Sequence, residues 1–150
     1  MRPQRRGRSI AMSPVEIDAY LTTERTCRVA TVGTHGPHVA PLWFVWVDDA
    51  LWLNSVVRSQ RWRDISLNPD IAVVIDSGEA YDELRGIEIL GRAEPIGGVP
   101  RTSMPSIQLA AVEAEYAGKY AGTTTFVPDG RHAWLCVRPT KITSWDFRKR

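Results

Sequence analysis

Apolar residues along this chain fall mainly into short, β-rich runs separated by turn signals. These runs predict strands at residues 27–32, 37–47, 50–57, 71–76, 86–96, 132–137 and 141–146, the last two separated by a bend at Pro139. Neighbouring runs are joined by short turns, so we expect a mostly antiparallel sheet. Strands this numerous in 150 residues predict a closed or partly closed barrel, and therefore a mainly β fold of the α+β class.

Helical signals flank these strands. Ser13 as N-cap, Pro14 in the first turn and Glu16 in a capping box predict a helix that runs to about Thr23. A second helix is expected to begin after Ser59 and to stop before the Asn68-Pro69 pair. An alanine-rich third helix is expected over residues 103–117.

The strand at 37–47 is apolar on both faces, which is unusual for a strand that is wet on one side. We therefore expect one face to line the barrel interior and the other to be covered by a ligand, a helix or a second subunit. Pro41 has no N–H to donate to a ladder, so it predicts an edge, a bulge or an opening in the sheet. The backbone of 38–43 is a candidate edge for a flat heterocycle, although plain core packing explains the same residues.

Arg58, Arg61 and Arg63 stand where a strand ends and a helix starts. Basic side chains are unfavourable at the positive end of a helix, by a few tenths to about 1 kcal/mol each. A bound phosphate would reverse that sign, because free amides, the Ser59 hydroxyl and the guanidinium groups would converge on one anion. The alternative is a solvated basic face in which Arg63 pairs with Asp64 or Asp70, and the residues alone leave both interpretations open.

No local motif predicts a nucleophile or an acid–base pair. Asp48-Asp49 is interpreted as a turn, and Tyr116 and Tyr120 as packing residues that lie within reach of a ligand. A chain without catalytic side chains favours a site where a cofactor carries the chemistry and the protein positions it.

Composition narrows the classes of function. The net charge of +2 does not indicate a nucleic-acid binder, and no apolar run is long enough to cross a membrane. Cys27 and Cys136 lie in apolar runs and are expected to be free thiols in a cytoplasmic protein. The three histidines are scattered, so no metal site is expected. Residues 1–11 are basic and are expected to be a disordered leader ahead of one domain over 12–150.

Several short motifs, in this order and spacing, carry a resemblance that extends from about Ser13 to Lys149. They are Arg28-Val-Ala-Thr-Val-Gly, Pro37-His-Val-Ala-Pro-Leu-Trp, Leu51-Trp-Leu, Arg58-Ser-Gln-Arg, Asn68-Pro-Asp, Tyr81-Asp-Glu-Leu-Arg-Gly, Gly91-Arg-Ala-Glu and Ser144-Trp-Asp-Phe-Arg-Lys. The chain resembles the pyridoxamine 5'-phosphate oxidase-like split barrels, and more narrowly their branch that depends on the deazaflavin F420.

This resemblance implies a six-stranded antiparallel split β-barrel with flanking helices, forming a homodimer with two equivalent cofactor sites at the interface. In relatives the strand-to-helix segment holds the cofactor phosphate, with a basic residue, often lysine, at the position of Arg61. The tricyclic ring lies on the strand that matches Val39 to Trp43, and Trp145 matches a strand near the interface. The implied cofactor-binding residues are Val39, Ala40, Pro41, Leu42, Trp43, Asn54, Ser55, Val56, Arg58, Ser59, Gln60 and Arg61.

The expected activity is hydride transfer from reduced F420 to an unsaturated small molecule, with water or Tyr116 as candidate proton donors. One alternative keeps the fold and uses FMN for oxidase or reductase chemistry. Another is a non-catalytic protein that binds flavin or haem. A nucleic-acid binder is disfavoured, because most aromatic residues lie in strands that are expected to be buried.

Overall fold

Six strands close into a barrel in the order β1-β2-β3-β6-β5-β4, and every neighbouring pair is antiparallel. The computed structural model describes residues 1–150. The strands are β1 (Thr26–Gly33), β2 (Gly36–Val47), β3 (Ala50–Val56), β4 (Asp70–Ser77), β5 (Arg85–Ile96) and β6 (His132–Asp146). The expected six-stranded antiparallel barrel is confirmed.

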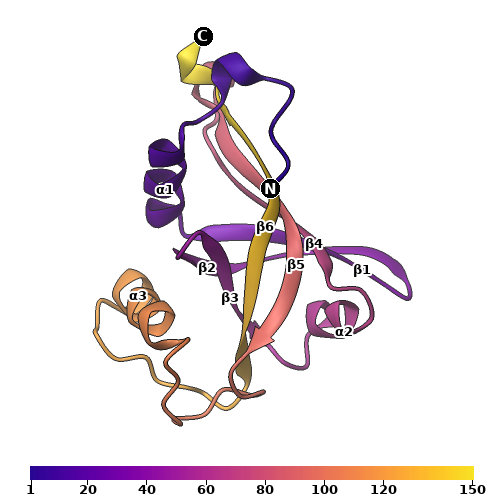
Figure 1. Ribbon diagram of the computed structural model, residues 1–150, viewed down its shortest axis with the longest axis vertical. Helices are drawn as coiled ribbons and strands as arrows, with labels where there is room; N and C mark the ends of the chain where they lie inside the picture. The colour runs from indigo at the N-terminus through magenta and orange to yellow at the C-terminus, as the bar shows by residue number, and fades with distance from the viewer.

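Three α-helices flank the barrel: α1 (Pro14–Thr23), α2 (Gln60–Leu67) and α3 (Ala110–Ala121). In Figure 1, α1 and α3 lie on one side, where both contact β2, while α2 packs on β1. Ser13 and Glu16 form the expected capping box of α1, and the Ser59 hydroxyl accepts from Trp62 N (3.2 Å) as the N-cap of α2. Short 3-10 turns cover Arg8–Ile10, Tyr81–Glu83 and Phe147–Lys149.

The core has two parts, which explains why β2 is apolar on both faces. Phe44 lies inside the barrel with residues such as Val29, Leu53 and Leu135, all fully buried. Its neighbour Val45 lies on the outer face in a second cluster beneath α3. Helix α3 thus covers the outer face of the second half of β2, which was one of the three covers expected for this strand.

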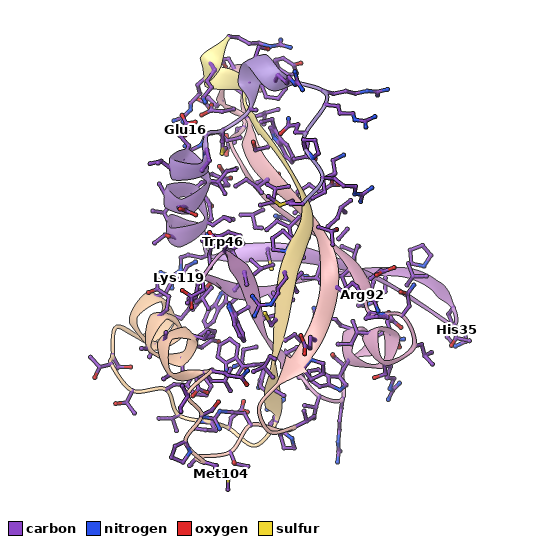
Figure 2. All side chains as sticks on the ribbon, in the orientation of Figure 1. Glu16, His35, Trp46, Arg92, Met104 and Lys119 are labelled. Carbon is purple, nitrogen blue, oxygen red and sulfur yellow. The ribbon has the colours of Figure 1, made fainter.

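Lys119 connects α3 to the rest of the molecule. Its Nζ donates to the carbonyl oxygens of Leu21 (3.2 Å) and Phe44 (3.3 Å), so one side chain ties α3 to α1 and β2 (Figure 2). Burial lowers the pKa of this ammonium group to about 8.

The β2–β3 hairpin turns at Asp48 and Asp49, as expected. Both residues have left-handed backbone, with φ of 53° and 56°. Two consecutive left-handed residues are typical of the two-residue turn that matches the twist of antiparallel strands.

The third helix and the last strand differ from the sequence-based expectation. α3 begins at Ala110 instead of Ser103, because the segment before it turns around the buried Arg101, which donates to Met104 O (2.6 Å) and pairs with Glu113 (2.8 Å). The helix continues through Gly118 and ends at Gly122, which takes the left-handed conformation (φ 64°).

The two strands expected on either side of Pro139 are one strand, β6. Pro139 pairs with Gly91, and the register against β5 shifts between Leu90 and Gly91. A bulge of this kind accommodates a residue that has no N–H for the ladder. The prediction of two separate strands at this point was therefore wrong, and a register shift in one strand accommodates Pro139.

Residues 1–11 lie along β6. Arg2 forms a parallel bridge with Lys141, and the Gln4 side chain makes two hydrogen bonds, each of 3.0 Å, with the backbone of Ser144. The division into a disordered leader and one domain over 12–150 stays a prediction.

Cys27 and Cys136 are free and buried, as expected. No helix combines the length and apolar character that a bilayer span requires, and no cluster of His, Cys, Asp and Glu has the makings of a metal site.

We predict that Gly33→Ala destabilises the protein. An added Cβ at this position in β1 would overlap Asp64 Oδ1 on α2, and that carboxylate is held by two hydrogen bonds. Overpacking of this kind costs about 1–3 kcal/mol, measured as the free energy of unfolding in urea. Gly118→Ala in α3 is the control, because its Cβ would meet nothing closer than 3.9 Å. That change should stabilise the protein by up to about 1 kcal/mol. Equal effects of the two substitutions would contradict the packing of α2 on β1.

Candidate functional site

β2 and β3 separate on one side of the barrel. They pair only from Phe44–Leu53 to Val47–Ala50, while β2 continues on β1 from Gly36 to Trp43 and β3 continues on β6 to Val56. We call the region between these two diverging ends the split. Residues 36–43 of β2 therefore have one free edge, which is the opening that Pro41 predicted.

Arg61 from α2 reaches into the split. Its side chain is buried, with only 7% of the residue exposed, and Nη1 donates to the Ser55 hydroxyl on β3 (3.0 Å). No carboxylate lies within ion-pair distance of Arg61, and its Nε has no hydrogen-bond partner. Burial lowers the pKa of this guanidinium.

Asp64, three residues further along α2, fixes the helix on β1. It accepts hydrogen bonds from Thr31 Oγ1 (2.7 Å) and from Gln60 Nε2 (2.7 Å), and these two bonds lower the pKa of the carboxyl group. Because residues i and i+3 share a helix face, the contact of Asp64 with β1 orients Arg61 toward the barrel.

The structure separates the arginines that the sequence grouped together. Arg61 is buried, whereas Arg58 and Arg63 are exposed. The alternative in which Arg63 pairs with Asp64 or Asp70 is wrong, because Asp64 bonds to Thr31 and Gln60 and Asp70 pairs with Arg92 (3.3 Å).

Gln60, another residue expected to bind the cofactor, is likewise engaged within the protein, because its Nε2 donates to Asp64. The Ser59 hydroxyl accepts from Trp62 N as the N-cap and keeps its own proton free to donate.

The candidate ring strand presents two different faces. His38, Ala40 and Leu42 share the inner face with their β1 partners, while Val39 (65% exposed) and Trp43 (47% exposed) point outward. Trp43 stacks on Tyr120, with ring centroids 4.3 Å apart and planes 9° apart.

The expectation that Tyr120 is a packing residue is confirmed. Its hydroxyl lies 2.6 Å from Arg25 O and 2.7 Å from Phe44 O, and accepts from Phe44 N (3.1 Å). Burial raises the pKa of this phenol well above its usual range, so Tyr120 holds α3 on the start of β1 and the middle of β2.

Three buried polar side-chain atoms have no hydrogen-bond partner within the protein. They are His38 Nδ1, Asn54 Oδ1 and Arg61 Nε, and no other buried side-chain nitrogen or oxygen of the chain lacks a partner. Unpaired polar groups cost free energy unless a ligand or water satisfies them. The residues around the split therefore fit a polar, anionic cofactor that approaches between β2, β3 and α2.

Sequence reasoning missed three side chains near this region. Thr31 holds Asp64, and Asp129 accepts from His132 Nδ1 (2.6 Å) at the start of β6. The signal for the second pair was the spacing Asp129-Gly130-Arg131-His132, in which an aspartate bonds to the backbone of the two residues after a glycine.

A barrel whose strands β2 and β3 part beside a buried arginine defines a split-barrel protein. The sequence agrees: residues 13–146 match the profile of the family described as Pyridoxamine 5'-phosphate oxidase. The chain belongs to this family. No curated protein matches the chain in sequence.

Several solved structures have a similar fold. A conserved hypothetical protein, Rv2991 from Mycobacterium tuberculosis, is 25% identical, with a TM-score of 0.79, over 97% of this chain and 91% of that one. An F420 reductase is also 25% identical, with a TM-score of 0.63, over 84% of this chain and 94% of that one. HutZ, a haem storage protein from Vibrio cholerae, shares the fold at 15% identity, with a TM-score of 0.68 over 88% and 94% of the two chains.

We predict that Asp64→Asn lowers stability at neutral pH and that the deficit shrinks in acid. The folded-state pKa of Asp64 lies below its unfolded value, so the ionised carboxylate stabilises the fold above about pH 4. That contribution is lost as the pH falls through the folded pKa. The measurement is urea unfolding of both proteins between pH 7 and pH 3. Asp82→Asn on the exposed 3-10 turn is the control, and a deficit independent of pH would refute the role of the charge.

Proposed function

We propose that this protein is an oxidoreductase that binds F420 in the split and uses it to reduce an unsaturated small molecule. The observation that carries the proposal is Arg61, a buried cation with a single neutral hydrogen-bond partner. A buried charge without a counter-ion is costly, and a phosphate supplied by a cofactor would remove that cost.

The choice of F420 rests on the charge around α2 and on similarity. Arg58 and Arg63 are exposed on either side of the helix start, where the acidic oligoglutamate tail of F420 would find cations. The similarity to an F420 reductase at 25% identity supports the same cofactor. FMN has a phosphate but no such tail, so it would bind Arg61 and make no contact with Arg58 and Arg63.

Each residue around the split has a defined part in this proposal. Arg61, Ser59 and the free N–H groups at the start of α2 would hold the phosphate. The free edge at Val39–Trp43 would carry the ring through its backbone, and Ser55 would keep Arg61 in place. When bound, reduced F420 supplies a hydride to an electron-poor carbon of the acceptor. The protein orients the two molecules and excludes water.

We also propose that the protein works as a homodimer. Val39, Pro41 and Trp43 form an exposed apolar row beside the free edge of β2. A second copy covering this row would bury apolar surface and close the split over the cofactor.

Cofactor titration tests the assignment. Quenching of F420 and FMN fluorescence by the purified protein should show tighter binding of F420. Arg58→Ala and Arg61→Ala should each weaken F420 binding tenfold or more, which corresponds to about 1.4 kcal/mol. Arg61→Lys keeps the positive charge, so it should lose less F420 affinity than Arg61→Ala. This comparison separates an effect of the charge from an effect on folding. Arg150→Ala at the C-terminus is the control. Tighter binding of FMN would replace the cofactor, and binding of neither would leave a non-catalytic protein.

Sedimentation velocity tests the dimer. The unchanged protein should sediment at twice the chain mass of 16.8 kDa, and Val39→Lys should shift it toward the monomer, because a charge would be buried in the interface. Val15→Lys replaces another exposed valine, on α1, and should leave the dimer intact. A monomeric unchanged protein at micromolar concentration would disprove the assembly.

A further inference from the structure

A small pocket opens between the end of β3, α3 and the loop before β6. Its volume is about 150 Å³, and its lining includes Asn54, Tyr116, Phe126 and His132. A cavity of this size holds one six-membered ring. The pocket lies on the outer face of the barrel, because Asn54 alternates with Ser55, whose side chain meets Arg61 from the inner face.

Two of the residues that line the pocket, Tyr116 and Phe126, contribute aromatic rings to its wall. Tyr116 packs edge-on against Phe126 (centroids 5.7 Å apart, 78°) and Trp134 (5.4 Å, 88°). Aromatic faces and edges pack favourably against the ring of another planar group. The shape and the chemistry of the walls therefore favour a planar, unsaturated ring.

Most polar groups of the pocket already have partners inside the protein. The Arg101 guanidinium is bound by Glu113 and by Met104 O, and Asp129 accepts from His132 Nδ1 and from two backbone N–H groups.

Asn54 Oδ1 is different, because it is buried and accepts from nothing. Tyr116 contributes a hydroxyl whose pKa is raised by burial, while a side-chain hydrogen bond with Asn54 acts in the opposite direction. The pocket therefore offers one unused acceptor and one donor beside each other.

The pocket adjoins the split. Asn54 is the residue of β3 immediately after the last one paired with β2, and the Tyr116 ring lies 6.3 Å from that of Trp43 on the candidate ring strand. A molecule in the pocket would thus lie next to a ring carried by Val39–Trp43.

We propose that this pocket is the acceptor subsite of the reductase. It takes a small unsaturated ring with a carbonyl and an adjacent N–H or O–H, such as a lactam or a hydroxyquinone. The Tyr116 hydroxyl donates to the carbonyl oxygen, and Asn54 Oδ1 accepts from the N–H or O–H. The assignment as an acceptor subsite rests on the proposed function, but occupation of the pocket can be measured without a cofactor.

The probe is 3-pyrrolin-2-one, an unsaturated lactam, titrated into the cofactor-free protein and followed by the amide and indole N–H signals in NMR spectra. We expect the Trp134 indole and the Asn54 amide signals to shift with saturation. The N-methylated lactam lacks the donor for Asn54 and should bind at least fivefold more weakly. This comparison uses the unchanged protein, so it does not depend on the folding of any variant.

Tyr116→Phe and Asn54→Leu should each weaken lactam binding at least fivefold, while Tyr81→Phe, an exposed tyrosine on the 3-10 turn, should not. Absence of saturable shifts, or equal binding of the two lactams, would mean that the pocket holds only water and would overturn the inference while F420 binding still stands. Lactam binding in a protein that binds no F420 would instead overturn the proposed function and, with it, the role of the pocket in reduction.

Discussion

The position of the Arg61 guanidinium is the constraint on which the site depends. Arg61 lies inside the split, held by the Ser55 hydroxyl and by no carboxylate. An arginine in solvent pays no desolvation free energy, whereas burying its charge is costly. α2 can keep it buried because Asp64, on the same helix face, is bonded to Thr31 across a close approach that Gly33 permits. Helix docking and the candidate anion site are therefore one structural feature.

The alternation of side chains along β3 gives the site two compartments. Ser55 faces inward to the buried cation, and Asn54 faces outward to the aromatic pocket beneath α3. Neighbouring residues of a strand point to opposite faces, so one short segment faces both the buried cation and the pocket beneath α3. In the proposed function these two compartments would serve different molecules, the phosphate of the cofactor and the acceptor.

The sequence predicts the local parts of this arrangement well. Capping residues, the Asp48-Asp49 turn and the opening at Pro41 depend on near neighbours, and all are present in the structure. It could not distinguish Arg61 from Arg58, because burial depends on how α2 docks on β1, far away in the chain.

Non-local contacts also explain the errors in the third helix and the last strand. Arg101 delays the start of α3 through its pair with Glu113, and a bulge opposite Gly91 lets β6 continue through Pro139. Local helix and strand propensities do not depend on distant partners such as Glu113 or Gly91. The boundaries of α3 were therefore the poorest part of the prediction.

The free edge of β2 shows why a ligand, and not another strand, suits the split. Phe44 directs its N–H and C=O toward Tyr120 beside the start of β1, so residues 43, 41, 39 and 37 direct theirs toward the free edge. Pro37 and Pro41 thus occupy positions where a missing N–H breaks no bond to β1. The edge retains carbonyl acceptors but few donors, so it is a poor template for a further strand. It can still hydrogen-bond the N–H groups of a flat heterocycle, and the adjacent apolar side chains would shield those bonds from water.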